Sequence, residues 1–155
     1  MRKTMLSVVV ISIVAFAGLL PFQGTDVGKL HPVEVIIVSC DKELILVETD
    51  TGLLGTGGSV DVAINELKIA SAGEIFLDTA NYVLINDNNM HLLNELFRYL
   101  RPACQIYVFS GDGVWDNVAK YLEAHPSDVT LLSYKQRSDG IPKLFADGED
   151  YRIER

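Results

Sequence analysis

Residues 74–86 read EIFLDTANYVLIN, a stretch rich in β-branched and aromatic residues that is interrupted by the polar pair Asp78 and Thr79. Apolar residues then recur at helical spacing over residues 92–100, and residues 105–109 (QIYVF) form a short apolar run typical of a buried strand. Strand, helix and strand in this order predict a βαβ unit whose two strands lie parallel in one sheet.

Upstream of this unit, β-branched runs at 33–39 (VEVIIVS) and 44–49 (LILVET) are separated by a short polar segment. Two such runs joined by a tight turn predict a β-hairpin. Apolar residues at helical spacing then extend from Val60 to Leu67, directly after Ser59, a residue type preferred at a helix N-cap. The hairpin is therefore expected to lead into a first helix.

Downstream of the unit, a third helical pattern occupies residues 114–122 and residues 129–132 favour a further strand. Residues 143–153 favour a hairpin that turns at Asp147 and Gly148. Together these elements predict an α/β fold, namely a single domain with a mixed β-sheet and about three helices.

The N-terminus carries a targeting pattern. Arg2 and Lys3 precede an uncharged apolar stretch over residues 6–20, which is the order of charge and hydrophobicity in export signals. Residues 15–17 (AFA) resemble a signal peptidase site, but the apolar run continues to Phe22, toward the roughly 17 to 25 residues that span a bilayer. We expect a retained apolar helix that anchors the protein, with a cleaved signal peptide as the alternative.

The expected organisation is a signal peptide or membrane anchor at 1–24, a tether at 25–32 and an α/β domain at 33–155. Basic residues that flank a membrane segment stay on the cytoplasmic side. Arg2 and Lys3 therefore predict that the domain lies at the cell membrane, on its extracytoplasmic side. A secreted protein is the alternative if the segment is cleaved.

The charge balance argues against nucleic-acid binding. From residue 31 onward the chain carries 10 basic and 20 acidic residues, and no run of Lys and Arg offsets this excess. A surface of this sign repels phosphate backbones and anionic lipid headgroups.

A glycine-rich segment, GLLGTGGS at 52–59, lies between a predicted strand and a predicted helix, where backbone N–H groups are able to bind phosphate. It lacks the lysine of a P-loop and does not match the dinucleotide fingerprint. We interpret it as a flexible strand-to-helix turn that ends in the Ser59 cap, and we expect no cofactor.

The candidate binding residues are polar or aromatic positions near predicted strand ends. Asp78 and Thr79 interrupt one strand, and Asp112 and Asp116 flank Trp115 after another. An acidic, aromatic loop suits a sugar or an amine, and protein interfaces place aromatic anchors within a polar rim. Each position also has a structural interpretation: Asp78 bonds a backbone amide, Asp112 caps the third helix, and Trp115 packs beneath that helix.

The remaining reactive residue types give no catalytic or metal pattern. Cys40 and Cys104 adjoin apolar runs, and both burial as small hydrophobic residues and a disulfide in an exported protein stay open. The three histidines lack metal-ligand spacing and are expected on the surface. No GxSxG occurs, and no Ser or Cys stands in a recognisable frame with a His. We expect no metal and no catalytic residue.

Four segments resemble the N-terminal domain of the Ger(x)C spore germination proteins. They are GTGGSVDVAINEL (55–67), EIFLDTANYVLIND (74–87), MHLLNELFRYLR (90–101) and QIYVFSGDGVWDNVAKYL (105–122). The similarity lies in the order of a glycine-containing turn, a helix, an interrupted strand, an amphipathic helix with a terminal Arg and an apolar strand. Members of that family usually carry a lipoprotein Cys after the signal peptide and continue into further domains, whereas this sequence has no Cys before Cys40 and stops at Arg155.

The resemblance implies a non-enzymatic, membrane-associated subunit that works with integral-membrane receptor subunits. We therefore expect an extracytoplasmic binding or assembly module like a spore germination receptor subunit. The alternatives are an exported small-ligand or carbohydrate-binding domain built around Asp112 and Trp115, and an exported hydrolase that uses the carboxylates.

Overall fold

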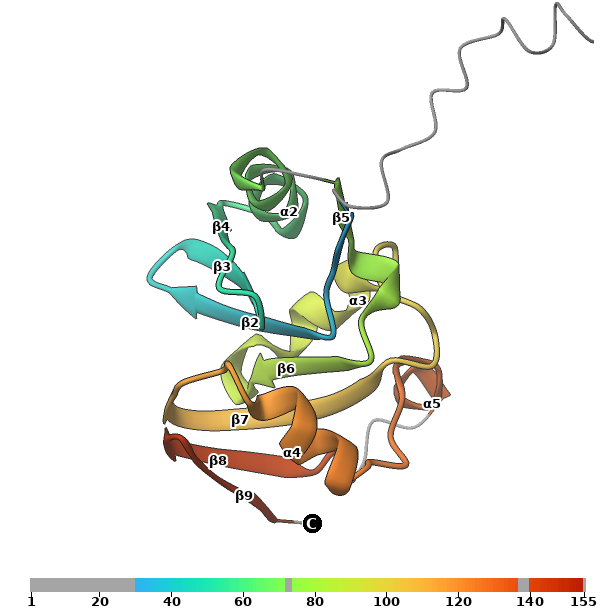
Figure 1. Ribbon diagram of the computed structural model, residues 1–155. Coiled ribbons are helices and arrows are strands. Elements are labelled where there is room, and N and C mark those ends of the chain that lie inside the picture. Colours follow the sequence, from blue (N-terminus) through green and yellow to red (C-terminus); the bar gives the residue numbers. More distant parts are fainter. Residues whose placement is uncertain (1–29, 72–73, 137–139, 155) are drawn as a thin grey trace, which may run out of the picture.

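The computed structural model describes residues 30–71, 74–136 and 140–154, which form an α/β domain around a mixed sheet (Figure 1). The strands lie in the order β4-β3-β2-β6-β7-β8-β9. Their bounds are β2 Val35–Asp41, β3 Leu44–Thr49, β4 Leu54–Gly57, β6 Tyr82–Asn86, β7 Gln105–Gly113, β8 Lys143–Gly148 and β9 Asp150–Glu154. Strands β2, β6, β7 and β8 are parallel, and β3, β4 and β9 are antiparallel additions at the two sides. The predicted α/β class with a mixed sheet is confirmed.

A small second sheet pairs β1 (Leu30–Pro32) in parallel with β5 (Glu74–Phe76). The tether predicted at 25–32 is therefore wrong at its end, because residues 30–32 are hydrogen-bonded to a strand from the middle of the domain. The anchor or signal predicted at 1–24 lies outside the described residues. Within the described part of the chain, no helix is both long and apolar enough to cross a membrane.

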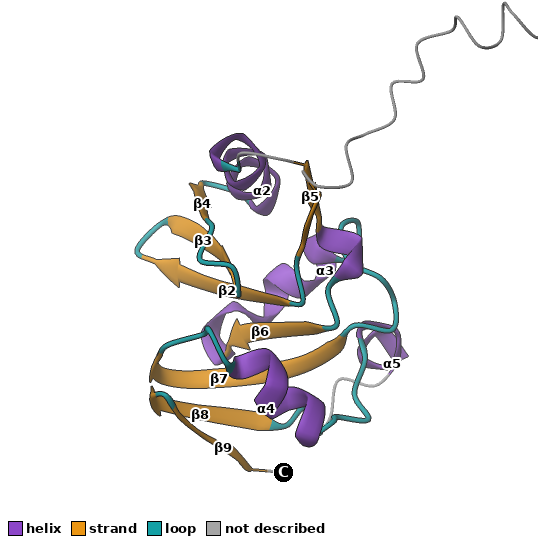
Figure 2. Cartoon of the chain, viewed as in Figure 1, coloured by secondary structure: helices purple, strands orange, loops and turns teal. Residues whose placement is uncertain are grey.

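The helices cover the two faces of the large sheet unequally (Figure 2). They are α2 (Val60–Ala70), α3 (Leu93–Leu96), α4 (Val118–Ala124) and α5 (Leu131–Gln136), with 3-10 turns η2 (Leu77–Thr79) and η3 (Asp87–Leu92). Buried side chains of α2, η3, α3 and α5 join the larger hydrophobic cluster on what we call the first face. Of the described helices, α4 alone contributes to the smaller cluster on the second face, through Val118 and Leu122.

Several local predictions are confirmed. The runs at 33–39 and 44–49 form the β2–β3 hairpin. Ser59 caps α2, since its Oγ accepts a hydrogen bond from the backbone N–H of Val62 at 3.3 Å. The stretch 74–86 is a strand, a 3-10 turn and a second strand, with the break where the polar pair lies. The terminal hairpin β8–β9 is also present, and Gly148 takes a positive φ of 60° at its turn.

The glycine-rich segment differs from the predicted flexible turn. Residues 54–57 form β4, which pairs with β3, and Gly55 and Gly57 face α2. A Cβ at Gly57 would lie 2.7 Å from the backbone nitrogen of Ala63. These glycines are required because the helix backbone packs directly on the strand.

Three predicted elements are wrong in extent or type. Of the helix predicted at 92–100, only Leu93–Leu96 form an α-helical turn, α3, which follows directly on the 3-10 turn η3; residues 97–100 are turns. The helix predicted at 114–122 begins only at Val118, since β7 continues to Gly113 by pairing with β8. The strand predicted at 129–132 is instead the start of α5, where Thr130 and Ser133 bond each other's backbone N–H groups in the manner of a capping box.

Candidate functional site

Asp78 lies at the rim of a shallow hollow between α2, the β5–η2 segment and the residues after α3. We call it the Tyr99 hollow. Its volume is about 270 Å³, and it is lined by Lys68, Glu74, Ile75, Phe76, Leu77, Asp78, Arg98 and Tyr99. Ile75 and Leu77 are buried and form an apolar floor, whereas the charged side chains are exposed. The hollow therefore combines a hydrophobic base with both signs of charge.

Asp61 of α2 fixes the aromatic wall of the hollow. Its Oδ1 accepts hydrogen bonds from Tyr99 Oη at 2.5 Å and from Arg98 Nη2 at 2.7 Å. The bond from Tyr99, together with Arg98, holds the pKa of the Asp61 carboxyl below its ordinary value, and the same bond raises the pKa of Tyr99. Lys68 Nζ and the Arg98 guanidinium lie 5.9 Å and 5.7 Å from the centre of the Tyr99 ring. Arg98 and Tyr99 are thus held in place before any ligand binds.

Thr79 has a structural role in the same region. Its Oγ1 lies 2.6 Å from the carbonyl oxygen of Phe76 and 3.1 Å from that of Val33, and it accepts from the Val33 N–H at 3.3 Å. Because these contacts join η2 to the segment before β2, the hydroxyl links parts of the chain that are 46 residues apart. Thr79 is therefore engaged with the backbone, and Asp78 alone of this predicted pair lines the hollow.

Asp112 and Trp115 lie elsewhere, beside the end of β7. Asp112 is exposed within that strand, directly opposite Asp147 of β8. The interpretation of Asp112 as a helix cap is wrong, because Asn117 occupies the cap position of α4. Trp115 is half-buried and meets the Phe109 ring edge-on, with 5.3 Å between ring centres. Its ring is part of the second-face core.

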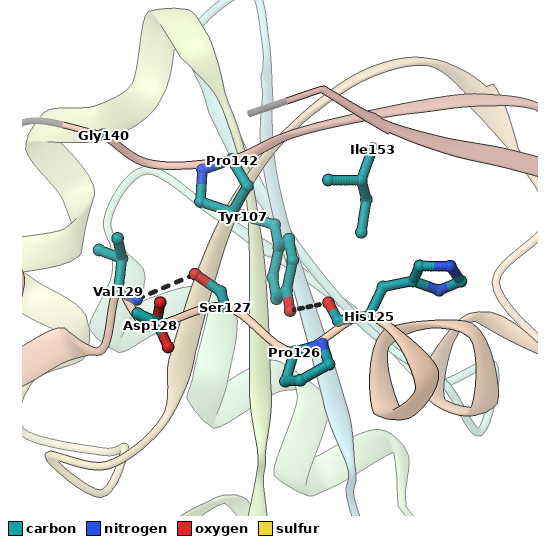
Figure 3. Close-up of a pocket in the computed structure, with 9 residues that line it drawn as sticks. All are labelled: Tyr107, His125, Pro126, Ser127, Asp128, Val129, Gly140, Pro142 and Ile153. Carbon is teal, nitrogen blue, oxygen red and sulfur yellow. Dashed lines mark hydrogen bonds between the residues drawn. The ribbon is translucent and has the colours of Figure 1, made fainter.

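A cavity of about 120 Å³ brings a serine, a histidine and an aspartate near one another (Figure 3). Ser127 Oγ is used by the backbone, since it accepts from the Val129 N–H at 3.0 Å. The His125 ring points away from Ser127 in Figure 3 and stacks on Tyr121 at 4.4 Å. Without a bond between the hydroxyl and the imidazole, these residues do not form the nucleophile–base pair that acyl transfer needs.

A feature that sequence reasoning missed lies on the second face of β3 and β4. Leu44 and Leu54 are 53% and 47% exposed there, and Leu46 lies between them in the sheet. Glu48, directly opposite Leu54, borders this strip. The signal was present in the run LILVET, which is apolar at positions that point to both faces of an edge hairpin. We call Leu44, Leu46 and Leu54 the leucine strip.

Both cysteines are free: Cys40 is exposed at the end of β2, and Cys104 is buried just before β7. The register through β6 separates them by six positions along the strand direction, which is roughly 20 Å. This is too far for a disulfide. His91 and His125 are exposed as predicted. Within the described ranges, no group of three or more His, Cys, Asp or Glu side chains is arranged to hold a metal ion.

Comparison with known proteins adds no relative: no family model, no curated protein and no solved structure matches this chain.

Proposed function

We propose that this protein is a non-enzymatic, membrane-associated module that binds or assembles with other proteins on the extracytoplasmic side. The observation that carries the proposal is the leucine strip, an apolar sheet surface that no described helix covers. Exposed apolar residues beside a polar rim are typical of protein interfaces. Integral-membrane receptor subunits are the proposed partners, in line with the resemblance to spore germination proteins.

The membrane part of the proposal rests on the sequence before the domain. Arg2 and Lys3 followed by the uncharged run to Phe22 favour an anchoring apolar helix with its basic end inside. Residues 25–29 would then be the tether, and five residues reach at most about 18 Å. Leu30 begins β1 and pairs with Glu74 of β5. The part of the domain around this pair would therefore lie close to the membrane.

Protease treatment of intact cells tests the topology. We expect the domain to be degraded without lysis, while a cytoplasmic control protein stays intact. A domain that is protected until lysis would contradict the extracytoplasmic placement. A soluble product that starts near Gly18 would show a cleaved signal and a secreted protein.

Crosslinking in native membranes tests the assembly role. The full chain carries a photoreactive amino acid at Asp78, at Leu54 or at Trp115. We expect a specific integral-membrane protein to be captured from at least one position. Capture of none, together with turnover of an ester, phosphate or glycoside substrate, would replace the proposal with the hydrolase alternative.

A second candidate function, small-ligand binding, is favoured by the Tyr99 hollow. The hollow offers cations at Lys68 and Arg98 and carboxylates at Glu74 and Asp78 around an apolar floor, which suits a small zwitterion. Titration of the full chain with a panel of free amino acids and sugars, followed by tyrosine fluorescence, tests it. Asp61→Asn should weaken any binding that depends on the fixed Arg98 and Tyr99.

A further inference from the structure

The leucine strip lacks the layer that covers the rest of the second face. Strands β6, β7 and β8 send side chains into the cluster around α4, whereas no residue of β3 or β4 belongs to that cluster. Figure 1 shows α4 in front of β7 and β8, and no helix in front of β3 and β4. Antiparallel strands such as β3 and β4 can leave one face open to water, but that face is then usually polar, whereas here it carries leucines.

Glu48 borders the strip, and a second carboxylate, Asp116, acts on it. Glu48 is partly buried on β3, and Asp116 lies near enough, in the segment before α4, to raise the pKa of Glu48 by repulsion, in addition to the larger effect of burial. Among the described residues, neither carboxylate has a Lys, Arg or His nitrogen within 4.0 Å, since the ion pairs found there involve other residues. Two like charges beside an apolar surface favour a partner that brings a cation.

We propose that the leucine strip is the docking site of an amphipathic helix from a partner protein, and that the helix places a Lys or Arg against Glu48 and Asp116. The proposal rests on the proposed function and specifies the surface and the chemistry of the partner. Leucines at helical spacing would fill the space beside Leu54 and Leu44, and the basic residue would stand at the edge of the apolar contact.

Other occupants fit the strip less well. Strand addition at β4 is opposed by Glu66, whose Oε2 accepts from the Thr56 N–H at 2.6 Å and from its hydroxyl at 2.7 Å, at the outer side of that strand. A second copy docked face to face would set the same carboxylates against each other, in a chain of net charge −8. The chain's own apolar residues 6–20 carry no cation.

A peptide of defined composition tests the docking site directly. The full chain is placed in nanodiscs of neutral lipid with a photoreactive amino acid at Leu54, and an 18-residue Leu/Lys amphipathic peptide is added. We expect crosslinking that saturates with peptide concentration. A matched peptide with Glu in place of Lys should bind at least tenfold more weakly, since it repels Glu48 and Asp116.

Matched variants show whether the basic peptide binds at the leucine strip or is merely attracted to the acidic protein as a whole. Leu44→Ser should weaken binding about tenfold, as expected for loss of one partly buried leucine contact. Ile69→Ser removes a more exposed apolar residue, 83% accessible on α2, and should change nothing. Glu48→Gln should weaken binding about fivefold, whereas Glu149→Gln makes the same change in net charge at the exposed turn between β8 and β9 and should have no effect.

The same Leu54 probe in native membranes identifies the natural occupant. Capture of a partner segment with apolar residues at helical spacing and at least one Lys or Arg beside them supports the proposal. Capture of an acidic segment, of a second copy or of residues 1–29 overturns it. Capture from Asp78 or Trp115 but not from Leu54 also overturns it, while leaving the assembly role intact. Peptide crosslinking that is equal for Leu/Lys and Leu/Glu peptides overturns it as well.

Discussion

The backbone carbonyl oxygen of Ala63 in α2 occupies the space that a side chain at Gly55 of β4 would need. A Cβ at Gly55 would lie only 2.1 Å from that oxygen. The obstacle is helix backbone, so it cannot move aside as a flexible side chain does. Helix α2 can therefore pack this closely on strand β4 only because residue 55 is a glycine.

Gly55→Ala is expected to destabilise the domain by about 1 to 3 kcal/mol, because α2 must shift away from β4. Urea unfolding followed by tryptophan fluorescence measures the change. Gly58→Ala is the matched control, because a Cβ at Gly58 meets nothing within 4 Å. Equal stability of the two variants would show that α2 does not pack on β4 as described.

Ser59→Ala is expected to cost about 1 kcal/mol, because it removes the side chain that accepts the Val62 N–H at the start of α2. Thermal unfolding by circular dichroism checks this. If stability is unchanged while inorganic phosphate or nucleotide binding is lost, the glycine-rich segment is a binding site and the cap interpretation is wrong.

The two cysteines should differ sharply in reactivity. Cys40 is exposed, while burial raises the pKa of the Cys104 thiol to about 12. Because the thiolate is the reactive form, a maleimide at pH 7 should label Cys40 alone in the folded protein and both cysteines in urea. Mass spectrometry reads the labels, and Cys40→Ser should then leave the folded protein unlabelled. Failure to label either cysteine in urea without a reductant would reveal a disulfide.

Glu48→Gln should stabilise the domain at pH 7. Burial, and to a lesser degree Asp116, raises the pKa of Glu48 above its ordinary value of 4.5, so the folded state holds the proton more tightly than the unfolded state. The stability of the natural protein therefore falls as the pH rises through this range. We expect a gain below about 1 kcal/mol, since the side chain remains partly hydrated.

The gain from Glu48→Gln should vanish below pH 4, where the glutamate is protonated in both states. Urea unfolding of the natural chain and the variant at both pH values measures it. A loss of stability at pH 7 would mean that Glu48 has a cationic partner within the chain.

The sequence determined the features that depend on near neighbours. β-Branched runs and turn residues predicted the β2–β3 and β8–β9 hairpins, Ser59 marked the start of α2, and the polar pair at 78–79 marked the break between β5 and β6. Each signal arises from side chains within about one helical turn or one hairpin, where propensity, capping and turn geometry act.

Only the tertiary structure decided features whose partners are distant in the chain. Strand β7 extends to Gly113 because it pairs with β8, whose residues lie 35 positions later in the sequence. Asp61 meets Arg98 and Tyr99 across separations of 37 and 38 residues, which creates the Tyr99 hollow. The leucine strip exists because α4 covers only part of the second face. Hydrophobic periodicity shows which residues can be buried, but the packing of distant elements decides which of them are covered.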